Sequence, residues 1–359
     1  MLSRRLLLLG LASTVPAARA AIAPAGEALR FPADFGAHPD ARIEWWYITG
    51  ALESVAAGAT TGFQITFFRA ATGLASAVGS RFVASQLVFA HAAVTDLAAR
   101  RLRHDQRIGR SGFGIAVAAE GDTDLTLGDW RLSRDGSAGK SLYRAVAASP
   151  GGGFAFALDL VATQPVLLQG DAGFSRKGPL PGQASRYYSE PQLSVRGRVD
   201  IAGKPSAVTG RAWLDHEWSD TVLDPAAVGW DWIGMNLDDG AALTAFRLRR
   251  ADGSALWAGG SYRPAGGPVR DFAPAEVRFT PGRVWVSAAT RARYPVQWTV
   301  DTPAGRFRVE ALLDDQELDS RASTGSVYWE GLSRLADADG RPVGRGYLEM
   351  TGYAGRLAL

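Results

Sequence analysis

The sequence predicts an all-β protein with two antiparallel β-barrel domains. Apolar residues alternate with a period of two along most of the chain, which is the pattern of half-buried strands. Asp-Gly pairs separate these runs at residues 135–136, 239–240, 252–253 and 339–340, as hairpin turns do. The 42 glycines and 18 prolines suit a fold made mostly of turns, and the strands are too many for one small barrel.

The first 20 residues have the parts of a secretory signal peptide. A basic head containing Arg4 and Arg5 is followed by an apolar stretch over residues 6–15, and Ala-Arg-Ala at residues 18–20 fits a cleavage site. The residues from Ser3 to Leu7 resemble a twin-arginine signal, and an ordinary secretory signal with two chance arginines is the alternative. We therefore expect an exported, periplasmic protein that is cleaved after Ala20.

The charge of the expected mature chain argues against a nucleic-acid partner. Removing residues 1–20 takes away three arginines, which leaves 36 basic residues (39 less 3) against 36 acidic residues. A formal net charge of zero gives no electrostatic basis for binding nucleic acid. No later segment approaches 18 uninterrupted apolar residues, so no transmembrane span is expected in the mature chain. The absence of cysteine excludes disulfides, cysteine-ligated metals and thiol catalysis, and the oligomeric state is left open.

The expected strands follow an irregular lead-in at residues 21–37. In residues 42–52, Ile43, Trp45 and Tyr47 share one face. Residues 85–94 are almost continuously apolar, which indicates a strand buried on both faces. Residues 92–107 are the only helix candidate, and we expect a strand, a turn and a strand there. The other expected strands cover residues 62–69, 154–161, 192–199, 208–218, 229–237, 242–249, 284–288, 296–301, 306–312, 326–335 and 344–353.

We place the domain boundary beside the Asp224-Pro225 pair. The N-terminal barrel is then expected over residues 38–222 and the C-terminal barrel over residues 223–359. A weak internal echo is consistent with a duplicated barrel: Trp-Tyr-Ile-Thr-Gly at residues 46–50 resembles Tyr-Leu-Glu-Met-Thr-Gly at residues 347–352, with one insertion.

Standard catalytic patterns are mostly missing. Gly139-Lys140-Ser141 lacks the earlier glycine of a phosphate-binding loop, because Arg134 stands in its place. No Gly-x-Ser-x-Gly nucleophile motif occurs. The four histidines show no spacing of a local metal site, so neither a metal ion nor another cofactor is expected.

Aromatic and acidic residues instead gather in three short stretches, at residues 44–47, 213–218 and 229–232. Strand alternation puts Asp215 and Glu217 on one face of the second stretch, and His216 and Trp218 on the other. In the third stretch, Asp231 points away from its two tryptophan neighbours. One interpretation is a tryptophan-rich core with carboxylates paired to arginines. The other is a deep apolar cavity with a carboxyl group or an imidazole in its wall.

A series of sequence blocks occurs in the order of one known family. These blocks are His38-Pro39, residues 44–50, 63–69, 91–96, 169–171, 175–178, 187–189, 213–218 and 229–232. From about His38 to Tyr353 the chain resembles the AttH/CrtC-like family, which includes carotenoid 1,2-hydratases. The resemblance implies two lipocalin-like barrels that either bind an apolar ligand or hydrate an isoprenoid double bond.

The family also suggests residues for that chemistry. In the hydratases a His-x-Trp pair is implicated in catalysis, with a tyrosine and an aspartate further along. His216 and Trp218 match the first pair, but no tyrosine follows Trp232 until Tyr262, so the second pair has no clear counterpart. The sequence looks closer to the exported, AttH-like branch of the family.

Hydration of an unactivated alkene requires an acid that is still protonated near neutral pH. A carboxyl group in an apolar cavity meets this condition, an imidazolium is the alternative, and tryptophan faces can stabilise the resulting cation. The candidate catalytic residues are His216, Trp218, Asp215, Glu217 and Asp231. The candidate ligand-binding residues are Glu44, Trp45, Trp46, Tyr47, His91, Tyr188, Trp230 and Trp232. We expect His216 and Trp218 to face the cavity, and a non-catalytic periplasmic carrier of an isoprenoid or lipid is the alternative function.

Overall fold

The computed structural model describes residues 28–74, 83–137, 139–221 and 223–356. The expected signal peptide at residues 1–20 lies outside these ranges. Within them, the regular structure is β apart from two short 3-10 helices, η1 (Ala33–Phe35) and η2 (Pro274–Glu276). The predicted all-β class with two lipocalin-like barrels is confirmed. No described helix has the length and apolar character needed to cross a membrane.

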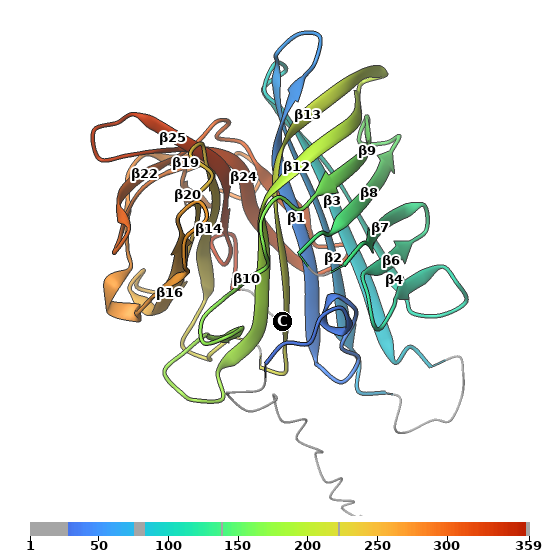
Figure 1. Ribbon diagram of the computed structural model, residues 1–359, viewed down its shortest axis with the longest axis horizontal. Helices are drawn as coiled ribbons and strands as arrows, with labels where there is room; N and C mark the ends of the chain where they lie inside the picture. Colours follow the sequence, from blue (N-terminus) through green and yellow to red (C-terminus); the bar gives the residue numbers. More distant parts are fainter. Residues whose placement is uncertain (1–27, 75–82, 138, 222, 357–359) are drawn as a thin grey trace, which may run out of the picture.

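The N-terminal sheet curls into a nearly closed barrel (Figure 1). Its strands lie in the order β4-β3-β2-β1-β13-β12-β9-β8-β7-β6-β5, and β10 and β11 pair with β12. Their bounds are β1 Ile43–Ser54, β2 Thr60–Ala71, β3 Gln86–Asp96, β4 Arg101–Arg110, β5 Ala116–Ala118, β6 Asp124–Leu127, β7 Trp130–Asp135, β8 Leu142–Ser149, β9 Phe154–Val161, β10 Leu167–Leu168, β11 Phe174–Arg176, β12 Ala184–Ile201 and β13 Lys204–Ser219.

The C-terminal sheet has the order β17-β16-β15-β14-β25-β24-β22-β21-β18, with β23 paired to β24. A separate hairpin is formed by β19 and β20. The bounds are β14 Gly229–Leu237, β15 Ala242–Arg249, β16 Ala255–Arg263, β17 Arg270–Phe272, β18 Arg278–Pro281, β19 Val284–Val286, β20 Arg293–Pro295, β21 Gln297–Thr302, β22 Gly305–Ala311, β23 Glu317–Ser320, β24 Ser326–Ala336 and β25 Pro342–Met350.

The stretch that was a helix candidate, residues 92–107, forms the end of β3, a turn and most of β4, as expected. The expected strand at residues 192–199 is only the second half of β12. Its first half was missed because Pro191 and a bulge between Glu190 and Leu193 interrupt the alternation. Gln192, in this bulge, has a φ of +59°. The short strands β5 to β8 were also missed, because polar residues such as Arg134 and Ser149 occupy inward positions that an apolar alternation would fill.

The two sheets pack face to face through their longest strands. In Figure 1, β1, β12 and β13 lie beside β14 and β25 at the centre of the molecule. An apolar cluster fills this contact: Tyr47, Leu167, Trp213, Trp232, Ala242, Phe246, Leu332 and Tyr347. The central strands of the N-terminal barrel are therefore covered on both faces, by the barrel interior and by the second sheet. This arrangement explains why their sequences are apolar on both faces.

Candidate functional site

Strand alternation sends the predicted site residues into two separate places. His216 and Trp218 on β13 point into the N-terminal barrel, where Trp218 belongs to the apolar interior. Asp215 and Glu217 on the same strand point to the contact between the sheets. Strand β1 is divided in the same way, because Glu44 and Trp46 face the interior while Trp45 and Tyr47 face the contact.

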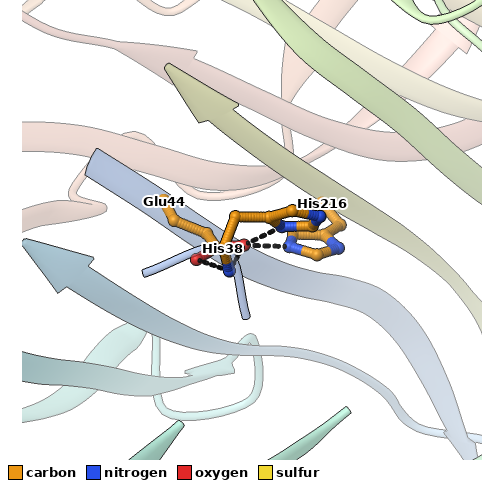
Figure 2. Close-up of side chains that lie close together, drawn as sticks. All are labelled: His38, Glu44 and His216. Carbon is orange, nitrogen blue, oxygen red and sulfur yellow. Dashed lines mark hydrogen bonds and ion pairs between the residues drawn. The ribbon is translucent and has the colours of Figure 1, made fainter. Parts of the chain in front are cut away.

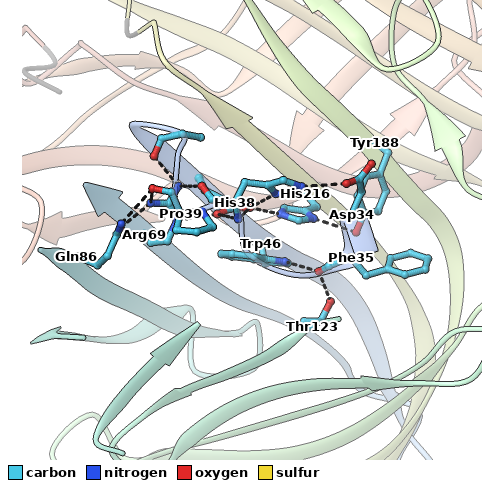
Figure 3. A network of polar contacts seen from close by, with 12 residues as sticks. Asp34, Phe35, His38, Pro39, Trp46, Arg69, Gln86, Thr123, Tyr188 and His216 are labelled. Atoms are coloured by element: carbon cyan, nitrogen blue, oxygen red, sulfur yellow. Dashed lines mark hydrogen bonds and ion pairs between the residues drawn. The ribbon is translucent and has the colours of Figure 1, made fainter. Parts of the chain in front are cut away.

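We call the first group the inner cluster: Asp34, His38, Glu44, Arg69, Tyr188 and His216. Figure 3 shows it as a continuous network of polar contacts. His216 is fully buried, with Nε2 at 2.9 Å from Oε1 of Glu44 and Nδ1 at 3.0 Å from the hydroxyl oxygen of Tyr188. Its ring stacks on Trp46 at 4.4 Å between centroids. The ring orientation of His216 is thus fixed by packing and by hydrogen bonds at both nitrogens.

Glu44 is the centre of the inner cluster. Its Oε1 also lies 2.7 Å from Nδ1 of His38 (Figure 2). Its Oε2 accepts hydrogen bonds from Nε of Arg69 at 2.7 Å and from the backbone N–H of His38 at 2.9 Å. Arg69 donates further hydrogen bonds to the carbonyl oxygens of His38 and Ala41, which hold the segment before β1 against the barrel. Glu44, on β1, therefore joins the loop that follows η1 to β2 and β13.

The charges of the inner cluster follow from these contacts. Burial alone would raise the pKa of Glu44, but hydrogen bonds from His216 and His38 hold it at about 2. Burial lowers the pKa of His216 to about 4, against the opposing effect of Glu44. For His38, burial is outweighed by Asp34 and Glu44, and the pKa is raised. At neutral pH Glu44 is ionised and His216 is a neutral donor to it.

We call the second group the interface cluster: Tyr47, Gln64, Lys177, Tyr187, Asp215, Glu217, Glu330 and Glu349. Asp215 accepts hydrogen bonds from Ser189 at 2.5 Å, from the Trp213 indole at 2.7 Å and from the Tyr187 hydroxyl at 2.9 Å. Trp232, across the contact, donates to the Tyr187 hydroxyl at 3.3 Å. Burial raises the pKa of Asp215 to about 7, although the three hydrogen bonds oppose this shift.

Two glutamates from the C-terminal sheet complete the interface cluster. Glu330 on β24 pairs in register with Glu349 on β25. Burial raises the pKa of Glu330 well above its usual range, and the charge of Glu349 adds to this effect. The pKa of Glu349 is raised to about 7 by burial and by the charges of Asp215 and Glu217. Glu330 therefore keeps its proton at neutral pH, and Glu349 and Asp215 are partly protonated there.

The oxygens of Glu330 differ in their contacts. Oε2 accepts a hydrogen bond from the side chain of Gln64 on β2. Oε1 is buried and has no close hydrogen-bond partner among the described residues, and the same is true of the hydroxyl of Tyr47. Beyond the effect of burial, the two groups interact with each other: Tyr47 lowers the pKa of Glu330, and Glu330 raises the pKa of Tyr47. Lys177 brings a positive charge to this acidic group. Its Nζ lies 3.1 Å from a carboxylate oxygen of Glu217 and over the rings of Tyr187 and Phe246.

The remaining predicted residues are spread around these clusters. His91 hydrogen-bonds the Tyr328 hydroxyl at 2.9 Å and Ser323 at 2.8 Å, so it bridges the two sheets. Tyr188 belongs to the inner cluster, and Trp230 and Trp232 pack in the contact. Asp231 lies apart from both clusters: Nε of Arg247 is 2.7 Å from it and the Tyr353 hydroxyl donates to it at 2.8 Å. Asp231 is thus paired with an arginine, as the interpretation of a tryptophan-rich core with paired carboxylates predicts.

The deep cavity that we expected inside the barrel does not surround His216. The barrel interior around His216 is filled by fully buried side chains, including Trp46, Phe35 and Phe67. Among the described residues, a hollow of about 290 Å³ beside Trp130 and one of about 250 Å³ beside Glu317 contain none of the predicted site residues.

Sequence reasoning missed Glu330 and Glu349. The echo between residues 46–50 and residues 347–352 contains Glu349, but it does not contain Glu330. Strands β1 and β25, which carry the two copies, meet at the contact between the sheets.

The fold and its two polar clusters define a class of protein: two lipocalin-like barrels packed face to face, with ionisable groups buried both inside one barrel and between the two. Within this class, the AttH-like family model matches residues 22–353. The chain belongs to the AttH-like family. A comparison with curated proteins finds no match.

Solved structures share the fold. An AttH protein from Nitrosomonas europaea is 50% identical, with a TM-score of 0.84, covering 92% of this chain and 100% of that chain. Kievitone hydratase from Nectria haematococca is 16% identical, with a TM-score of 0.69 and coverage of 91% and 94%. CghA bound to Sch210972 is 13% identical, with a TM-score of 0.53 and coverage of 87% and 88%. At such low identity the last two show similarity of fold alone.

Proposed function

We propose that this protein is a periplasmic hydro-lyase that adds water to, or removes it from, a carbon–carbon double bond of an apolar isoprenoid or lipid ligand. The observation that supports this proposal is the protonation of the buried carboxyl group of Glu330. This acid keeps its proton at neutral pH, because burial and the charge of Glu349 raise its pKa. Its Oε1 has no close hydrogen-bond partner among the described residues, and its interaction with the Tyr47 hydroxyl is one that a ligand would replace.

The chemistry balances with the groups present in the interface cluster. The proton of Glu330 is transferred to the less substituted alkene carbon, which leaves a tertiary cation and a carboxylate. Water adds to the cation and returns a proton to the carboxylate, so that the acid is regenerated. The faces of Trp213 and Trp232 would stabilise the cation in this apolar setting. The family fold, shared with kievitone hydratase, is consistent with this reaction class.

The experiment uses the apolar compounds that co-purify with the protein from periplasm. The extracted compounds are incubated with fresh protein in water labelled with heavy oxygen, and the products are analysed by mass spectrometry. We expect label in an alcohol product with the native protein and at least about 100-fold less with Glu330→Gln, the loss typical of removing a general acid. Glu310→Gln is the matched control, because Glu310 pairs with Arg334 outside the cluster.

A non-catalytic carrier is the second candidate function. It is favoured by the three hydrogen bonds at Asp215 and by the Lys177–Glu217 pair, since satisfied carboxylates also occur in inert interfaces. A carrier would return its ligand chemically unchanged, and Glu330→Gln would then alter at most the amount of ligand bound.

A further inference from the structure

The inner cluster brings three potential ligand atoms together inside the N-terminal barrel. Nδ1 of His38, Oε1 of Glu44 and Nε2 of His216 all lie within 4.8 Å of one another. Figure 2 shows both imidazoles directed at the same carboxylate oxygen. Two nitrogens and one oxygen in this arrangement are a common ligand set for a single zinc ion.

The two oxygens of Glu44 have different partners: Oε1 is contacted by the two imidazoles and, at 3.2 Å, by the backbone N–H of His38, so an ion there would take the place of the imidazole hydrogen bonds. Oε2 accepts hydrogen bonds from Arg69 at 2.7 Å and from the backbone N–H of His38 at 2.9 Å. These contacts fix the carboxylate plane and favour coordination through Oε1 alone. The side chains of Arg69 and Glu44 are 2% and 0% exposed, so this orientation is protected from solvent.

Each imidazole has a partner at its other nitrogen. Nε2 of His38 lies 3.2 Å from a carboxylate oxygen of Asp34, and Nδ1 of His216 lies 3.0 Å from the hydroxyl oxygen of Tyr188. Histidines that bind a metal typically donate their second N–H to such a group, which sets the tautomer and the ring orientation. Trp218 stacks on His38 at 3.7 Å with an interplanar angle of 7°, which further restricts that ring.

We propose that His38, Glu44 and His216 bind one divalent first-row transition-metal ion, with zinc as the ion that the ligand set fits best. The ion would replace the protons that the two imidazoles direct at Glu44. Asp34 would orient His38, and Tyr188 would orient His216. The side chain of His38 is 22% exposed, which provides access from solvent. The site is separate from the interface cluster and does not depend on its proposed activity.

The test is metal binding by the full chain. The protein is stripped with a chelator and titrated with Zn²⁺ by calorimetry, and with Co²⁺ by its visible absorption, which reports coordination geometry. We expect one ion per chain, and a Co²⁺ absorption spectrum that is typical of coordination by nitrogen and oxygen. His38→Gln should weaken Zn²⁺ binding by at least about 100-fold, and Asp34→Asn by about 10- to 100-fold.

His104→Ala is the matched control, because His104 lies on β4 outside the inner cluster; its affinity for Zn²⁺ should equal that of the native protein. His38 is partly exposed, so its variant should fold even where a variant of the fully buried His216 does not. The proposal is overturned if the stripped protein binds no ion at micromolar concentration, or if His38→Gln binds Zn²⁺ as tightly as the native protein does.

Discussion

Glu330 on β24 and Glu349 on β25 lie directly opposite each other on neighbouring strands, at the face where the two barrels meet. Like charges in such a cross-strand pair destabilise a sheet, and burial adds to the cost of ionising both groups. The pair therefore retains protons near neutral pH, and the two side chains titrate as one coupled unit.

This pair makes stability depend on pH. In the unfolded chain Glu349 ionises near pH 4.5, and in the folded chain its pKa is about 7. The folded state therefore binds the extra proton between these values, so its stabilising contribution is complete below 4.5 and is lost as pH rises toward 7. We expect Glu349→Gln to raise the free energy of unfolding by about 1–3 kcal/mol at about pH 8, with a much smaller gain at about pH 4.5. Urea denaturation across this range measures the difference, and an equal gain at both pH values would contradict it.

Arg69 is expected to be essential for folding of the N-terminal barrel. Arg69→Ala leaves Glu44 buried without its guanidinium partner and removes the hydrogen bonds from the guanidinium to the carbonyl oxygens of His38 and Ala41. Removing one member of a buried ion pair typically costs about 3–5 kcal/mol. Thermal unfolding followed by circular dichroism should show this loss. Arg131→Ala, an exposed arginine on β7, should change stability by less than about 0.5 kcal/mol.

Gln192 is expected to couple the two barrels. Its side-chain amide donates to the carbonyl oxygens of Leu237 at 2.9 Å and Ala241 at 2.7 Å, and its backbone N–H donates to Asn236. Gln192→Ala removes both amide hydrogen bonds, while the carbonyls of Leu237 and Ala241 each keep a backbone N–H donor, so we expect a loss of about 1 kcal/mol. Gln192→Gly separates the contribution of the positive φ, because glycine adopts it without strain. If the Gln192→Ala variant is as stable as the native protein, the amide contacts do not couple the two barrels.

Export is expected to remove residues 1–20. N-terminal sequencing of protein from the native host should find Ala21 as the first residue. Replacement of Arg4 and Arg5 by lysine should block export where the twin-arginine route is used and leave it unchanged on the general secretory route. A periplasmic protein that begins at Met1 would rule out cleavage.

The sequence predicted the fold and the division of β13, but only part of the interface cluster. Alternation alone placed His216 and Trp218 opposite Asp215 and Glu217, because successive side chains of a strand point to opposite faces. The contact of Gln64 with Glu330 joins residues 266 positions apart, and no local pattern encodes it. The barrel interior was expected to be hollow, whereas its large aromatic side chains fill it.

The alternation along β13 also restricts changes in the length of this strand. A deletion or insertion of one residue in the strand would move His216 out of the barrel and bring a carboxylate into it, since a shift of one position exchanges the faces. The bulge in β12 between Glu190 and Leu193 occurs after the pairs Tyr187–Glu217 and Tyr188–His216 along that strand, so both pairs keep their register. A change in length that keeps both clusters must therefore fall outside these pairs. The inner and interface clusters share one register on β13, so a shift that disturbs one of them disturbs the other.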